Sequence, residues 1–165
     1  MEKLGADHPD TLGSMMNLAA LYSNQGRDEE AEPLYLQSLE GYRVILGADH
    51  PDTLMVMSNL AVLYKNQGRY DEAEPVYLQS LEGYRVKLGA DHPDTLRSMM
   101  NLAILYENQN RYEEAETLYL QCLEGRRAKL GADHPDTLLC MDNLAALYNN
   151  QGRYQSSGSC ACVLA

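Results

Sequence analysis

Phe and Trp are both absent from this chain of 165 residues, so its large apolar positions must be filled by Leu, by 12 Tyr and by 8 Met. Basic residues are also scarce, because 13 Lys and Arg stand against 24 Asp and Glu and leave a net charge of −11. Nucleic-acid binding needs a basic face that neutralises phosphates. The composition therefore predicts no nucleic-acid partner.

Long apolar runs are missing as well, so we expect no transmembrane segment, and no signal sequence is recognised. The cysteines do not recur with any period, and they are therefore not expected to form a disulfide framework. They are Cys122, Cys140, Cys160 and Cys162. These absences favour a reducing, cytoplasmic setting.

Repetition is what the chain does contain. The octapeptide GADHPDTL recurs with a spacing of 42 residues, starting at Gly5, Gly47, Gly89 and Gly131. Residues 47–88 match 89–130 at 30 of 42 positions, an identity that indicates recent duplication or deliberate consensus design. The sequence leaves both origins open. A period of this length is typical of stacked helical repeats.

These boundaries divide the chain into the end of a preceding helix, three full repeats, a partial fourth repeat and an irregular tail. The end of the preceding helix is residues 1–4. The full repeats are 5–46, 47–88 and 89–130, the partial repeat is 131–154 and the tail is 155–165. The fourth repeat has no recognisable second helix, so its outer face near Leu138 is expected to stay partly exposed. Exposed solenoid ends favour self-association.

Each repeat predicts two helices. In the first, helix A, Pro9 fits the opening turn and either Asp7 or His8 can cap it. Apolar residues then follow the i, i+3, i+4, i+7 spacing of an amphipathic helix. The predicted core residues are Met15, Leu18, Ala19 and Tyr22 in repeat one, and Met57, Leu60, Ala61 and Tyr64 in repeat two.

The letters NQGR predict where helix A ends. Gly68 and its counterparts are expected in the left-handed conformation that terminates many helices, and Asn110 replaces Gly in repeat three because Asn tolerates that conformation. The second helix, helix B, is predicted from about Tyr70 to Leu88, with Pro75 making it begin late or bend. Its predicted core residues are Ala73, Tyr77, Ser80, Leu81 and Tyr84.

The pattern HPDTL…NLAxLYxNQGRYxEAEPxY and its period resemble the tetratricopeptide repeats of kinesin light chains over residues 4–154. This resemblance implies an all-α fold, a right-handed superhelical solenoid of antiparallel helix pairs. It also implies a non-enzymatic scaffold whose concave groove binds extended peptide segments of a protein partner.

In the family that the chain resembles, one face of helix A lines the groove, and here that face carries two Asn per repeat. An amide offers two donors and an acceptor, so it can bind a peptide backbone. Asn is a poor helix former, so a mid-helix Asn without a role would be a small, repeated cost. The candidate peptide-binding residues are Asn17, Asn59, Asn101, Asn143, Asn66, Asn108, Lys65 and Arg97. The open alternative is that near-identical repeats copy a neutral residue.

Lys65 and Arg97 join this set because they differ between repeats and are therefore candidates for partner discrimination, as are Ser58, Met100, Glu107 and Asp142. A mixed or neutral peptide is favoured over a strongly acidic one.

Motifs for catalysis are absent: there is no Gly-rich phosphate loop, no Gly-x-Ser-x-Gly and no His-Glu-x-x-His. We therefore expect no enzyme activity and no cofactor. The four His of the octapeptides could suggest a metal, but equivalent points on packed helices lie too far apart to share one ion. Capping of the helix starts is the favoured interpretation.

The last four residues, from Cys162 to Ala165, fit a prenylation box, which makes Cys162 a lipidation candidate; a truncated gene model would explain the same tail. The main prediction is a peptide-binding scaffold. Its alternative is a structural or self-assembling array, a natural fragment or a consensus design, without a specific peptide ligand.

Overall fold

The structure is a computed structural model and describes residues 8–152 of the chain. Within those residues all regular structure is helical. The helices are α1 (Pro9–Asn24), α2 (Asp28–Leu46), α3 (Pro51–Asn66), α4 (Tyr70–Leu88), α5 (Pro93–Asn108), α6 (Tyr112–Leu130) and α7 (Pro135–Asn150). The predicted all-α fold of two helices per repeat is confirmed, and helix B of repeat two has the predicted bounds.

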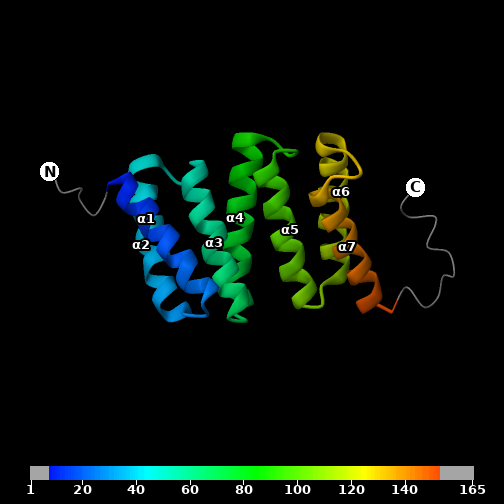
Figure 1. Cartoon of the computed structure of the whole chain (residues 1–165), viewed down its shortest axis with the longest axis horizontal. Helices are drawn as coiled ribbons and strands as arrows, with labels where there is room; N and C mark the ends of the chain where they lie inside the picture. The colour runs from blue at the N-terminus through cyan, green and yellow to red at the C-terminus, as the bar shows by residue number, and fades with distance from the viewer. Residues whose placement is uncertain (1–7, 153–165) are drawn as a thin grey trace. The chain divides into compact units, whose positions relative to one another are not determined.

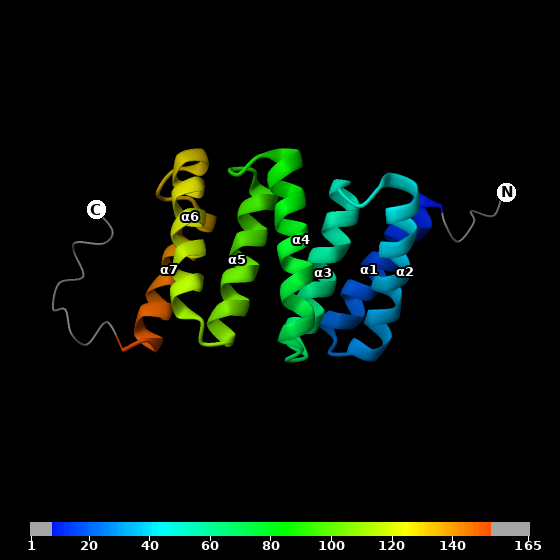
Figure 2. The same cartoon turned by 180° about the vertical axis from the view of Figure 1, so that it is seen from behind.

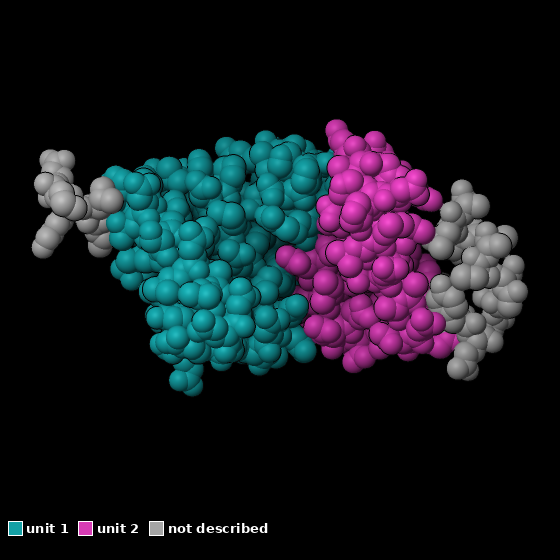
Figure 3. All heavy atoms as spheres, viewed as in Figure 1, with its two compact units in different colours: residues 1–98 teal, residues 99–165 magenta. Residues whose placement is uncertain are grey.

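The chain forms two compact units, residues 1–98 and residues 99–165, and the boundary falls inside α5 (Figure 3). In unit 1, α1 packs antiparallel on α2, α3 packs on α4, and α2 lies against α3, as Figures 1 and 2 show from opposite sides. In unit 2, α6 packs on α7. The helix B of one repeat thus covers the helix A of the next within each unit.

The repeated octapeptide builds the junction between repeats. Gly47 ends α2 with φ of 93°, a region that favours glycine. The buried Thr53 hydroxyl donates a hydrogen bond of 2.8 Å to the Gly47 carbonyl and so holds the loop to the next helix. His50 then accepts the Asp52 N–H at Nδ1, at 3.2 Å. The cap is therefore the His, which settles the choice between Asp and His.

Leu54, the last residue of the second octapeptide, sets the distance between α3 and α4. Leu54 is 1% exposed and packs on Gly83 of α4, where an added Cβ would lie 2.5 Å from the Leu54 side chain. Leu12 and Gly41 repeat this contact between α1 and α2. Glycine on helix B therefore lets helix A approach closely, which larger residues would prevent.

The NQGR turn uses the predicted left-handed residue. Gly68 has φ of 75° and Asn110 has φ of 60°. The Arg69 N–H donates to the Tyr64 carbonyl at 2.9 Å and closes the turn. Its guanidinium lies over the Tyr64 ring, 4.2 Å from the centroid, and pairs with Glu72 at 2.7 Å. The arginine thus links the end of helix A to the start of helix B.

The predicted helix A core is confirmed in the second repeat and is wrong at one position of the first. Leu60 and Leu63 are 2% and 0% exposed, whereas their counterparts Leu18 and Leu21 are 40% and 51% exposed. The difference arises because α2 covers that face of α3, while no described helix precedes α1.

Pro75 neither delays nor ends its helix, because α4 already begins at Tyr70 and continues to Leu88. The expectation of a late start is therefore wrong. The proline lies within the first two turns, where the loss of one N–H donor is tolerated near the surface. In repeat three, Thr117 stands in its place and donates to the Glu113 carbonyl at 2.9 Å.

The turn geometry yields a stability prediction. Gly68→Val should reduce the free energy of unfolding by about 1 kcal/mol or more, because a β-branched residue resists positive φ. No atom would contact the new Cβ within 4 Å, so the loss would come from backbone strain alone. Asn110→Gly should be neutral or mildly stabilising. Urea melts of both variants test this, and equal midpoints would contradict it.

Candidate functional site

The candidate peptide-binding residues lie on the helix A segments α1, α3, α5 and α7. In unit 1, Asn17 of α1 is exposed and Asn59 of α3 is half-buried. Asn66 is exposed at the end of α3. Since α1 and α3 are in contact, the two mid-helix amides lie on adjacent helices of one compact unit. This is the placement that a ladder of backbone-binding amides requires.

In unit 2 the amides are partly engaged within the protein. Asn143 Nδ2 lies 3.1 Å from the Met100 sulfur. Asn150 Nδ2 donates to Glu107 at 2.9 Å. Asn101 is half-buried and Asn108 is exposed. The Asn143 amide therefore has an internal partner that a peptide would have to replace.

The two basic candidates have different surroundings. Lys65 is half-buried, and burial lowers the pKa of its ammonium group by disfavouring the charged form. Arg97 is exposed and pairs with Asp94 at 2.8 Å. The expectation that Met100 and Ser58 discriminate among partners is wrong, because they are only 5% and 6% exposed.

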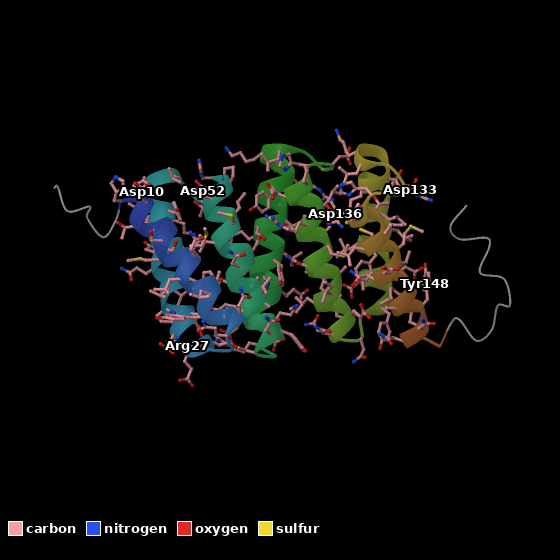
Figure 4. All side chains as sticks on the ribbon, in the orientation of Figure 1. Asp10, Arg27, Asp52, Asp133, Asp136 and Tyr148 are labelled. Atoms are coloured by element: carbon pink, nitrogen blue, oxygen red, sulfur yellow. The ribbon has the colours of Figure 1, made fainter. Side chains whose placement is uncertain are left out.

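A pocket of about 560 Å³ opens beside Asn17 in unit 1. Asp10, Tyr42 and Asp52 contribute to its lining, together with the backbone at Gly13. Figure 4 shows Asp10 and Asp52 at the same end of unit 1, and Arg27 at the opposite end. Burial raises the pKa of Tyr42, and the charges of Asp52 and Asp10 raise it further, so both carboxylates act on the pocket.

The equivalent place one repeat later in unit 1 holds a basic side chain. Burial and the Asp94 carboxylate raise the pKa of Tyr84, while the charge and hydrogen bond of Arg97 lower it. Arg97 therefore lies within reach of Asp94 and Tyr84 together. Its counterpart in repeat two is Met55, which brings no charge to Asp52 and Tyr42.

Sequence reasoning missed this pocket. Asp10 and Asp52 lie in the first turns of α1 and α3, where negative charge favours the helix dipole without any ligand, and Tyr42 is a buried residue of α2. The sequence signal for it is the change from Gly13 and Met55 to Arg97, one of several differences between repeats on this face. That change becomes informative once Arg97 is seen beside a carboxylate and a phenol.

One buried tyrosine position differs between repeats. The Tyr119 hydroxyl donates to Glu107 at 3.0 Å in unit 2. Its counterpart Tyr77 is 0% exposed, and no hydrogen-bond partner for its hydroxyl is found among the described residues. Lys65 occupies the position in repeat two that Glu107 occupies in repeat three. A donor there cannot accept the phenol proton.

Helix pairs joined by left-handed turns, with α3 covered by α2 and α7 covered by α6, define a helical-repeat protein. The family model for the tetratricopeptide repeat matches residues 10–85, 52–128 and 101–157. The chain therefore belongs to the tetratricopeptide repeat family.

Solved structures agree with this assignment. A kinesin light chain-like protein of Podospora anserina with nearly identical TPR-like repeats is 30% identical, with a TM-score of 0.81 over 90% of this chain and 70% of that one. BtubC (BKLC) of P. vanneervenii is 25% identical, with a TM-score of 0.81 over 94% of this chain. The present chain spans 61% of the length of BtubC.

The type III secretion translocator chaperone SycD of Yersinia enterocolitica shares the fold at 17% identity, with a TM-score of 0.64 over 91% of this chain and 90% of SycD. No curated protein matches the chain.

The family model and the Podospora anserina structure together confirm the resemblance to kinesin light chain repeats.

Two further expectations concern membranes. None of the helices in residues 8–152 is long and apolar enough to cross a bilayer. Cys162, the lipidation candidate, lies outside the described residues, as do the predicted segments 1–4 and 155–165.

Within residues 8–152, no three His, Cys, Asp or Glu side chains gather as a metal site would require.

The two tyrosines give a matched test. Tyr119→Phe should reduce the free energy of unfolding by about 1–2 kcal/mol, because it removes a hydrogen bond to a charged group. Tyr77→Phe should be neutral or stabilising, since it removes a buried hydroxyl without a protein partner. Urea denaturation followed by circular dichroism measures both. A larger loss at Tyr77 than at Tyr119 would contradict the assigned hydrogen bonds.

Proposed function

We propose that this chain is a non-enzymatic interaction scaffold that binds an extended peptide segment of a protein partner along the helix A face. The observation that carries the proposal is the pair of accessible amides, Asn17 and Asn59, on the adjacent helices α1 and α3. An amide side chain can donate to and accept from a peptide bond at once. Membership of the tetratricopeptide repeat family supports a protein partner.

The pocket beside Asn17 suggests the chemistry of the bound segment. Arg97 places its guanidinium against Asp94, within reach of Tyr84. The corresponding Asp52 and Tyr42 line a pocket of about 560 Å³. A peptide carrying Arg or Lys would bring its own cation to this place and pair with a carboxylate. We therefore favour a peptide with one basic anchor residue over an acidic one.

The proposal also covers the charge of the partner, the location of the protein and the other candidate amides. The charge of −11 suits a basic partner segment and no nucleic acid. A cytoplasmic location fits the scaffold class and the thiols of Cys122 and Cys140. Asn66 lies on α3 with Lys65 and Asn59, and Asn101, Asn108 and Asn143 are the corresponding amides on α5 and α7.

The Asn17→Ala, Asn59→Ala double variant tests the amide contacts. Each lost contact should cost roughly 0.5–1.5 kcal/mol, so affinity should fall roughly 5- to 150-fold. Helicity should hold or rise slightly, because Ala is the better helix former. The measurement is isothermal titration with an Arg-containing peptide selected from an array.

The matched control is Gln79→Ala, which removes an exposed amide from helix B of the second repeat and should leave affinity unchanged. Glu72 is unsuitable as a control because it pairs with Arg69 at 2.7 Å. If the double variant binds as tightly as the parent, the Asn ladder has no role in peptide binding.

A separate variant tests the basic anchor. Met55→Arg should place a guanidinium beside Asp52, as Arg97 lies beside Asp94, and should compete with the ligand cation. Affinity for an Arg-containing peptide should fall by about tenfold, while the same peptide with Arg replaced by norleucine should bind both proteins alike. Equal affinity of both proteins for the Arg peptide would contradict the pocket assignment.

The second candidate function is a self-assembling array, favoured by one observation. Leu18 and Leu21 are 40% and 51% exposed, although their counterparts in repeat two are buried. A second copy could cover this edge. Sedimentation equilibrium of the parent and of Leu21→Glu tests the idea: assembly should weaken in the variant. A parent that stays monomeric at all concentrations would leave the peptide-binding scaffold as the better explanation.

A further inference from the structure

Three departures from the repeat pattern meet at one place in unit 2. Position 122 is Cys where repeats one and two have Ser, and position 126 is Arg where they have Tyr. Position 140 is Cys where the first three repeats have Ser, Val and Ser. Cys122 belongs to α6 and Cys140 to α7, and their sulfur atoms lie 3.2 Å apart. Both side chains are fully buried, at 0% exposure.

Arg126 brings a charge to this pair. It is 8% exposed and donates from Nη1 to the Asp136 carbonyl at 2.7 Å, so its position is fixed between α6 and the start of α7. The pKa of Cys140 is lowered, first because the Cys122 thiol donates a hydrogen bond to it and then because Arg126 lies close. The pKa of Cys122 is raised by that same hydrogen bond and by burial.

We propose that Cys122 and Cys140 form a reversible disulfide bond that joins α6 to α7, with a low-molecular-weight disulfide such as oxidised glutathione as the oxidant. The sulfur atoms lie 3.2 Å apart, so they must approach to about 2 Å for the bond to form. This inference is independent of the peptide-binding proposal, because it concerns the thiols between α6 and α7 and not the helix A face.

The chemistry balances as two successive thiol–disulfide exchanges. The Cys140 thiolate attacks one sulfur of the small disulfide, breaks its S–S bond and releases one small thiol, leaving a mixed disulfide on Cys140. Cys122 then loses its proton and attacks the Cys140 sulfur, which releases the second small thiol. Two protein thiols are oxidised to one disulfide, and one small disulfide is reduced to two thiols that take up both protons.

The oxidant reaches the buried pair through local opening of α7. This helix is less covered than α3, because Leu138 is 45% exposed whereas its counterpart Leu54 is 1% exposed, and the neighbouring Leu139 is 50% exposed. Ala145 is half-buried, whereas its counterpart Ala103 is 0% exposed. Segments with fewer buried contacts open at lower free energy than the rest of a fold. Once formed, the disulfide would hold α7, and with it Asn143, on α6.

The test uses the full chain with Cys160→Ser and Cys162→Ser, so that only the proposed pair can react. Folded protein is incubated with oxidised glutathione, denatured, alkylated and digested. We expect a peptide linked through Cys122 and Cys140, about 2 Da lighter than its two reduced parts. The thermal midpoint should rise by about 5 °C or more, because the bond restrains the unfolded chain, and dithiothreitol should reverse the rise.

Two controls come from the chain's own repeats. Cys122→Ser restores the residue of repeats one and two, and Cys140→Ser restores that of repeats one and three. Neither variant in the same background can form the link, and neither should gain thermal stability under oxidation. The proposal is overturned if the folded protein yields no linked peptide. It is also overturned if the mixed disulfide persists on Cys140, or if the linked protein melts no higher than the reduced one.

Discussion

Coverage of each helix A by the helix B before it is the constraint on which this structure depends. A single pair of amphipathic helices leaves one apolar face open, and only the next pair can cover it. Leu60 and Leu63 are buried because α2 lies against α3, whereas Leu18 and Leu21 have the same residue type and the same register but are exposed. The repeated sequence therefore serves to bury these apolar faces, and α1, which no described helix precedes, keeps part of its face exposed.

The junctions that permit this stacking rely on small residues and local hydrogen bonds. Gly83 lets Leu54 approach α4, and Thr53 and His50 hold the loop that turns the chain into the next helix. At the other end of the pair, Arg69 stacks on Tyr64 and pairs with Glu72. The stacking also pairs Arg69 with Glu32 of the previous repeat at 2.7 Å, so one side chain connects three helices of unit 1.

Both proposals rest on the few positions that the repeats do not share. Arg97 brings a charge to a place that Met55 leaves uncharged, and Cys122 with Cys140 forms a pair of thiols where repeat one has two Ser. These differences are single residues within helices of unchanged length. A scaffold of this kind can therefore change what it binds, or how it responds to oxidation, without altering the helix packing that supports it.

The sequence by itself determined the local structure. The bounds Tyr70–Leu88 and the left-handed Asn110 follow from interactions between residues close in the chain, whereas the choice of His over Asp as the cap was made only by the structure. Tertiary structure decided what depends on distant partners: the exposure of Leu18, the burial of Met100 and the contact between Asn143 and Met100. It also brought Cys122 to Cys140. Periodicity identifies which face of a helix is apolar, but whether a neighbour covers that face is a property of the assembled fold.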